Sequence, residues 1–151
     1  MMPKSQINSL IVGLLVLAIL SLLSNMVESH YFWKRVAEVR MLTGTNNSFE
    51  AAGEVATEPN TVIMGLLTIC IRYSIAVYIA LIGIRQSILT NAVLFGLVAV
   101  VLANIIKAFW GIGSVVNYPW ITLLEVVVAL IMCTVIGYFM QWKAKKSQDA
   151  T

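Results

Sequence analysis

The sequence predicts an all-α membrane protein: a four-transmembrane-helix antiparallel bundle with a long first helix and a mostly helical external segment between helices 1 and 2. Hydrophobic residues make up 60% of the 151 residues and charged residues 11%. An average soluble domain is about 45–50% apolar and about 25% charged. The mean hydropathy is +0.89, and the apolar residues fall into long runs. This composition excludes a disordered chain, a nucleic-acid-binding domain and a disulfide-stabilised scaffold.

Four apolar runs are long enough to cross a bilayer. A helix crosses a hydrocarbon layer about 30 Å thick with about 20 apolar residues, and backbone groups in lipid must be paired within the element itself. Arg72 alone interrupts the second run and Glu125 the fourth, while Gly111 and Gly113 mark a turn after the third. The predicted helical spans of this single domain, residues 1–151, are 7–27, 61–84, 89–110 and 120–141.

Residues 28–60 are the only sizeable segment outside the predicted spans. We expect the first helix to continue past the membrane to about Leu42, because no Pro or Gly interrupts its helical spacing of apolar residues. Gly44 is the expected helix stop, and a short helix is expected at 48–56, weakened by Gly53. The segment is large enough to cap the mouth of the bundle.

The basic residues near the span ends predict the orientation. Five lie on the side of the chain termini and three on the other side: Lys4, Arg85, Lys143, Lys145 and Lys146 against Lys34, Arg35 and Arg40. We therefore expect both termini in the cytoplasm and residues 28–60 outside. In plan and length the chain is similar to small four-span membrane proteins of bacteria, and this likeness implies a bacterial inner (plasma) membrane.

Charged residues within the spans are the candidate functional residues. Burying a charge in a membrane costs at least about 2.5–3.5 kcal/mol on insertion scales, so Arg72, Lys107 and Glu125 each need a reason to be there. We expect all three to meet in the outer half of the bundle, with Asn104 on the same helix face as Lys107. The candidate ligand-binding set is therefore Arg72, Lys107, Glu125 and Asn104. Two bases facing one acid favour an anionic small molecule or a lipid headgroup.

A purely structural role is the alternative for these charges, in which Glu125 pairs with Arg72 or Lys107 and fixes the helix register. The face of Arg72 also predicts a close helix contact, because small residues share it: Gly65, Thr68, Ala76 and Gly83. Cys70 and Cys133 are expected to be apolar core residues.

No catalytic, metal or cofactor pattern stands out. The sequence has no His-x-x-His, Glu-x-x-His, Cys-x-x-Cys or Gly-x-Ser-x-Gly motif and no phosphate-binding glycine loop. We therefore assign no catalytic residue, metal or cofactor. Three functions stay open: binding or transport of an anion or lipid headgroup, an accessory or assembly subunit of a larger membrane complex, and a membrane-embedded enzyme. The expected partners are the lipid bilayer and either a second copy or another membrane protein.

Overall fold

The computed structural model describes residues 4–84, 86–110 and 119–148, without the side chains at 4–5, 107–110 and 148. The described residues are all-helical. Their helices are α1 Lys4–Thr43, α2 Ser48–Thr57, α3 Pro59–Leu81, α4 Ile88–Trp110 and α5 Pro119–Gln148. All of these except α2 are long and apolar enough to span a membrane, which confirms the four predicted spanning helices. The second span is shorter than predicted, because α3 ends at Leu81.

The first helix continues well beyond the predicted span, as expected. Helix α1 has 40 residues, which at 1.5 Å per residue is about 60 Å, roughly twice the hydrocarbon thickness. It ends where Gly44 adopts φ +67°, a left-handed conformation that suits glycine. The Gly44 N–H donates to the Arg40 carbonyl at 3.0 Å and so closes the last turn.

The expected short helix is also present, as α2. Asn47 caps it, since its side-chain oxygen accepts from the Phe49 N–H at 3.1 Å. Helix α2 packs back onto the outer part of α1 and forms a small core of its own: Val36, Val39, Ala51, Ala52 and Val55, with Phe32 packed against it. We call residues 28–58 the hairpin.

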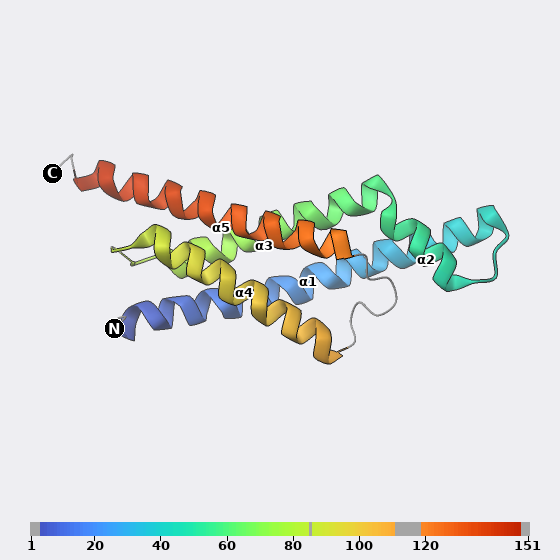
Figure 1. The fold of residues 1–151 in the computed structure, drawn as a ribbon, viewed down its shortest axis with the longest axis horizontal. Coiled ribbons are helices and arrows are strands. Elements are labelled where there is room, and N and C mark those ends of the chain that lie inside the picture. The colour runs from blue at the N-terminus through green and yellow to red at the C-terminus, as the bar shows by residue number, and fades with distance from the viewer. Residues whose placement is uncertain (1–3, 85, 111–118, 149–151) are drawn as a thin grey trace.

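The hairpin extends away from the bundle instead of capping it (Figure 1). Among the described residues, α2 contacts α1 and α3 but neither α4 nor α5. The segment is large enough to cap the bundle mouth, but among the described residues it does not do so. The reason is that α1 stays helical beyond residue 27, which carries the hairpin outward along the bundle.

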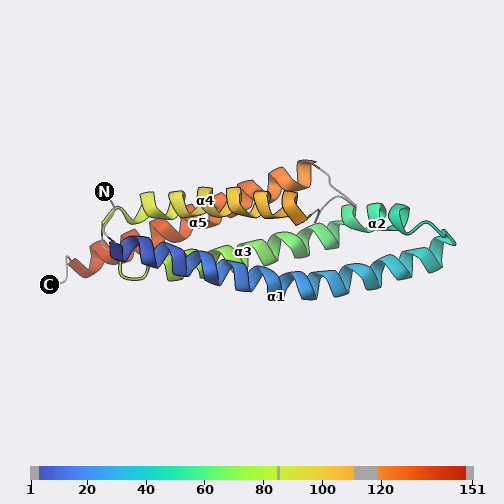
Figure 2. The same cartoon turned by 90° about the horizontal axis from the view of Figure 1, so that it is seen from below.

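The spanning helices pack in the order α1, α3, α5, α4, with each of them lying along the next. Helix α1 begins, α5 ends and α3 turns into α4 at the same end of the molecule (Figure 1). We call this the terminal end and the opposite one the hairpin end. The last turns of α4 lie apart from α3 and α5 in Figure 1 and apart from α1 in Figure 2.

The buried core of the bundle lies entirely in its terminal half. Going from the termini toward the hairpin, the last buried residue of the bundle on each helix is Leu17 on α1, Ile69 on α3, Ala99 on α4 and Ala129 on α5. In the described parts of the four helices between these limits and the hairpin, no residue is buried. The bundle is therefore close-packed near the termini and loosely packed toward the hairpin.

Glycines allow the close packing of the terminal half. A Cβ added to Gly13 would lie 3.0 Å from the Ala76 carbonyl oxygen and would overlap the Ala80 Cβ, so α1 and α3 touch backbone to backbone. Gly137 meets Ala92 in the same way between α5 and α4. Cys133 is fully buried in this core, as predicted.

The small-residue stripe predicted around Arg72 is only partly a helix contact. Ala76 is fully buried against α1. Gly65 has nothing within 4 Å of an added Cβ, so no helix approaches it closely. Gly83 lies beyond the end of α3 with φ +85°, where its role is to form the turn toward α4. The close contact lies instead one to two turns toward the terminal end.

Candidate functional site

Arg72 lies on α3 at the boundary of the packed core, and its side chain is directed toward the hairpin end. Two contacts define how α1 and α3 are aligned: Gly13 lies against Ala76 and Ala80, and Arg35 is bound to Glu58. Between these contacts, the antiparallel alignment places Arg72 level with about residue 20 of α1. Its Nη1 nevertheless donates to the Ser24 hydroxyl at 3.1 Å. The guanidinium therefore lies about one helical turn closer to the hairpin than its own Cα, as expected for a long side chain in a membrane.

The Ser24 hydroxyl is oriented to receive this bond. Ser24 donates its own proton to the Ser21 carbonyl at 3.2 Å, which leaves its oxygen lone pairs available to accept from Arg72. One guanidinium nitrogen of Arg72 is thus satisfied. Its Nε is buried and has no hydrogen-bond partner among the described residues.

The described residues form two ion pairs with one another, and both involve Arg35. The ion pair considered between Arg72 and Glu125 is not one of them. Glu125 lies half-buried on α5, the helix that packs along α3 on the side away from α1. Glu125 takes part in a polar or electrostatic interaction. The hydrogen bond of Arg72 goes instead to α1.

The amide of Asn104 is bound within its own helix. Its side chain is exposed, and its Nδ2 donates to the Val100 carbonyl one turn back on α4 at 2.9 Å. The amide is thus used by its own helix. The side chain of Lys107 and the predicted turn at Gly111 and Gly113 lie outside the described residues.

The structure adds a polar interface that the sequence analysis missed, between α1 and α3. We call it the α1–α3 seam: Ser21, Ser24 and Glu28 on α1, with Thr61 and Arg72 on α3. It contains three of the four buried side-chain atoms that lack a partner among the described residues: Glu28 Oε1, Thr61 Oγ1 and Arg72 Nε. Buried polar atoms in folded proteins are nearly always hydrogen-bonded, so each of these atoms marks a place where a further polar group fits.

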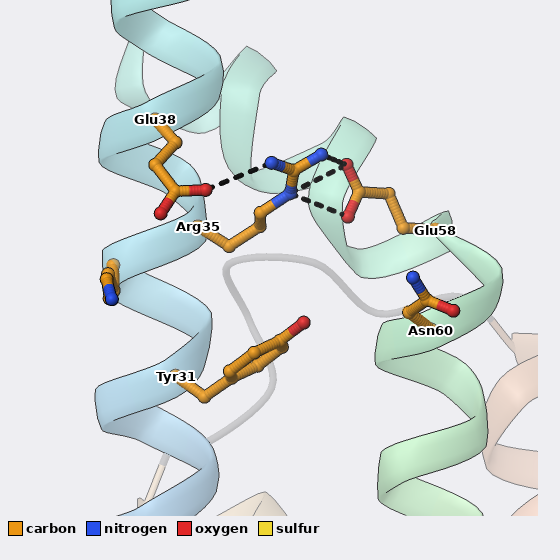
Figure 3. Close-up of a pocket in the computed structure, with 6 residues that line it drawn as sticks. Tyr31, Arg35, Glu38, Glu58 and Asn60 are labelled. Atoms are coloured by element: carbon orange, nitrogen blue, oxygen red, sulfur yellow. Dashed lines mark hydrogen bonds and ion pairs between the residues drawn. The ribbon is translucent and has the colours of Figure 1, made fainter.

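A cleft of about 320 Å³ continues the seam at the hairpin (Figure 3). Its volume is at the lower end of the range of small-molecule pockets, and its lining is polar and charged: Tyr31, Lys34, Arg35, Glu38, Glu58 and Asn60. The Tyr31 ring and the Asn60 amide project into the space between α1 and α3, beneath the Arg35 guanidinium (Figure 3).

Arg35 holds α1 to the junction of α2 and α3. Its Nε and Nη2 both donate to the Glu58 carboxylate, at 3.0–3.2 Å, and its Nη1 donates to Glu38 at 3.0 Å. The hydrogen bonds to Glu58, and then to Glu38, raise the pKa of Arg35 further above its ordinary value. Glu58 is also the residue at which α2 ends and α3 begins. The bonds of Arg35 therefore set the spacing of α1 and α3 on the hairpin side of the seam.

The sequence did contain a signal for this site. Glu28, Tyr31, Arg35 and Glu38 recur at helical spacing and form a polar face beside the apolar residues of the hairpin core. That face predicts an interface with another polar surface, although it does not say with which one.

No protein-family model, curated protein or solved structure matches this chain. The case for function therefore rests on the geometry of the molecule.

Proposed function

We propose that this protein is a four-span antiparallel bundle of a bacterial inner membrane, with both termini cytoplasmic, that binds a phosphate- or carboxylate-bearing molecule or lipid headgroup at its outer half. The observation that carries the proposal is the Arg72 guanidinium, with one nitrogen bound to Ser24 and Nε buried without a partner. An arginine in such a place is suited to a planar anionic group, because its N–H donors match two acceptor oxygens.

Binding is better supported than conduction. On the hairpin side of Arg72 the seam is polar and leads to the cleft. On the terminal side the helices meet through Gly13, Ala76 and Ala80 and bury only apolar side chains around them, apart from Asn91 near the α3–α4 turn. A polar ligand entering from the hairpin end therefore meets an apolar barrier below Arg72. Glu125, Lys107 and Asn104 remain in the proposal as polar residues of the same half.

The test compares two lipids that differ in whether they carry an anionic phosphoglycerol headgroup. The purified protein is exposed in detergent to phosphatidylglycerol or to diacylglycerol with the same acyl chains, and bound lipid is counted by native mass spectrometry. We expect retention of phosphatidylglycerol over diacylglycerol, and a drop of about tenfold or more in Arg72→Gln, since a charge-assisted hydrogen bond is lost.

A matched control removes a basic residue outside the seam. Lys143→Gln takes an exposed charge from the end of α5 and should leave retention unchanged. If Arg72→Gln folds poorly, Ser24→Ala keeps the charge but frees the guanidinium, and it should alter phosphatidylglycerol retention without affecting diacylglycerol. Equal retention in the wild type, Arg72→Gln and Ser24→Ala would overturn the proposal.

An accessory role is the second candidate, and the tip of the hairpin favours it. Met41, Leu42 and Phe49 are 84%, 80% and 69% exposed there, beside a second cleft of about 330 Å³ whose only charged lining residue is Arg40. Exposed apolar side chains gathered outside the membrane are typical of contact sites. Affinity purification with Met41→Ser and Phe49→Ser as paired variants tests this role, because a partner bound at the tip is lost in both.

A further inference from the structure

The α1–α3 seam holds a second charged group, Glu28, which has one buried oxygen and whose position relative to Arg72 narrows the class of ligand. Glu28 follows Ser24 by four residues, so both lie on one face of α1. Side chains on a helix lean toward its N-terminus, which brings the Glu28 carboxylate over the turn of Ser24, where the Arg72 guanidinium is bound. The two charges therefore face the same short stretch of the seam.

Glu28 and Arg72 are nevertheless not in contact. Both are described residues, and they form no ion pair, while Glu28 Oε1 and Arg72 Nε are each buried without a partner. One is an acceptor and the other a donor. A group placed between them satisfies both only if it accepts from Arg72 and donates to Glu28. The two charges cancel, so a purely anionic ligand would meet repulsion from Glu28, and a purely cationic one repulsion from Arg72.

We propose that the seam binds a zwitterion, with its phosphate or carboxylate on Arg72 and a primary ammonium on Glu28. This inference rests on the proposed function and refines its ligand class. The ammonium must carry N–H groups, because a quaternary nitrogen has no proton to donate to Glu28 Oε1. The Thr61 hydroxyl, also buried without a partner, is a further hydrogen-bonding group on the α3 side.

Depth and access agree with this ligand class. Glu28 follows directly on the predicted first span and Ser24 lies just inside it, so the pair is near the membrane surface, where headgroups lie. The 320 Å³ cleft lined by Tyr31 and Asn60 lies about one helical turn beyond Glu28 on the hairpin side. The loosely packed hairpin end leaves apolar helix faces exposed beside it, including Leu22, Leu23 and Leu67, which suit acyl chains. An ethanolamine lipid and a soluble phosphoethanolamine share the required chemistry.

The experiment compares three lipids with identical acyl chains on the wild-type protein: phosphatidylethanolamine, phosphatidylcholine and phosphatidylglycerol. Bound lipid is counted by native mass spectrometry. We expect phosphatidylethanolamine to be retained about tenfold over phosphatidylcholine, the size of one charge-assisted hydrogen bond, and also over phosphatidylglycerol. Glu28→Gln should abolish the preference between ethanolamine and choline. The matched control is Glu54→Gln, an exposed carboxylate on α2, which should keep it.

Competition with soluble phosphoethanolamine then identifies the source of the ligand. Displacement of the lipid shows that the headgroup alone suffices, and retention of the lipid shows that acyl chains contribute; both agree with a zwitterion. Two results would overturn the zwitterion proposal: equal retention of the ethanolamine and choline lipids, or tighter binding of phosphatidylglycerol. If binding still depends on Arg72 in either case, the proposed function stands. Loss of Arg72 dependence overturns the proposed function itself.

Discussion

The terminal and hairpin halves of the bundle are built from the same four helices yet differ in almost every physical respect. In the terminal half the helices touch through Gly13 and Gly137 and enclose side chains such as Phe95 and Val77 that are 2% exposed or less. In the hairpin half the described helices bury no residue, and three polar atoms lack partners.

The difference separates two tasks within one small fold. Lipid tails are as apolar as the side chains, so close packing is what holds membrane helices together, and the terminal half supplies it. The hairpin half is then free to carry charges and partly satisfied polar groups that would destabilise a tightly packed region. Under the proposed function, binding and stability lie at opposite ends of the bundle.

The first prediction concerns which half faces the cell exterior, and its effect is all-or-none. A cysteine at Asn46, an exposed residue beyond Gly44, should react with a membrane-impermeant maleimide on intact cells, while one at Ser147 should react only after lysis. Asn46 is preferable to Asn47, which caps α2. The parent protein with Cys70 and Cys133 gives the background, and labelling at Ser147 on intact cells would invert the orientation.

The second prediction is that the hairpin fails locally when α1 is interrupted. Val36 is 2% exposed in the hairpin core, and a proline inside a helix costs about 3 kcal/mol or more. Val36→Pro should therefore make the tip around residues 44–47 cleavable by protease within minutes, while the bundle keeps its thermal stability. Val36→Ala separates lost packing from the helix break and should be milder. Unfolding of the whole protein by Val36→Pro would show that the halves are not independent.

The third prediction compares two glycines in the two halves. Gly13→Ala should destabilise the protein by about 1–3 kcal/mol, because the added Cβ overlaps Ala80 in a packed contact. Gly65→Ala, where an added Cβ meets nothing within 4 Å, should be neutral or stabilising, since alanine favours a helix by about 0.5–1 kcal/mol. Thermal denaturation in detergent measures both, and equal effects would contradict the contrast in packing.

The smallest predicted effect is the coupling between Arg72 and Glu125. Because Arg72 donates to Ser24, the stability losses of Arg72→Leu and Glu125→Leu should add, with a coupling below about 0.5 kcal/mol. A buried ion pair predicts the opposite, namely single losses of about 3–5 kcal/mol that are largely restored in the double variant. Recovery of folded yield in the double variant would establish the pair.

The elements of the fold were predictable because they depend on local sequence. Hydropathy over about 20 residues defines each span, the absence of Pro and Gly after Glu28 continues α1, and Gly44 ends it. The end of α3 was misplaced because Ile82 and Ile84 are as apolar as the helix before them, while the positive φ of Gly83 turns the chain.

The site was less predictable because it depends on which helices are neighbours. Arg72 was expected to face Glu125, but α3 lies between α1 and α5, and its guanidinium turns to α1. Hydropathy does not contain this packing order. Arg35 was interpreted only as a charge that sets the orientation. Its contact with Glu58, 23 residues away, was not predicted, because that contact depends on how the hairpin folds back.

The uninterrupted length of α1 has a mechanical consequence. One rigid helix runs from the packed contact at Gly13, past Ser24, to the hairpin tip at Thr43. Measured from Gly13, the tip lies about 45 Å away and Ser24 about 16 Å at 1.5 Å per residue. A rotation of α1 about its contact at Gly13 would therefore move the tip about threefold farther than Ser24, and the bonds of Arg35 to Glu58 oppose such a rotation.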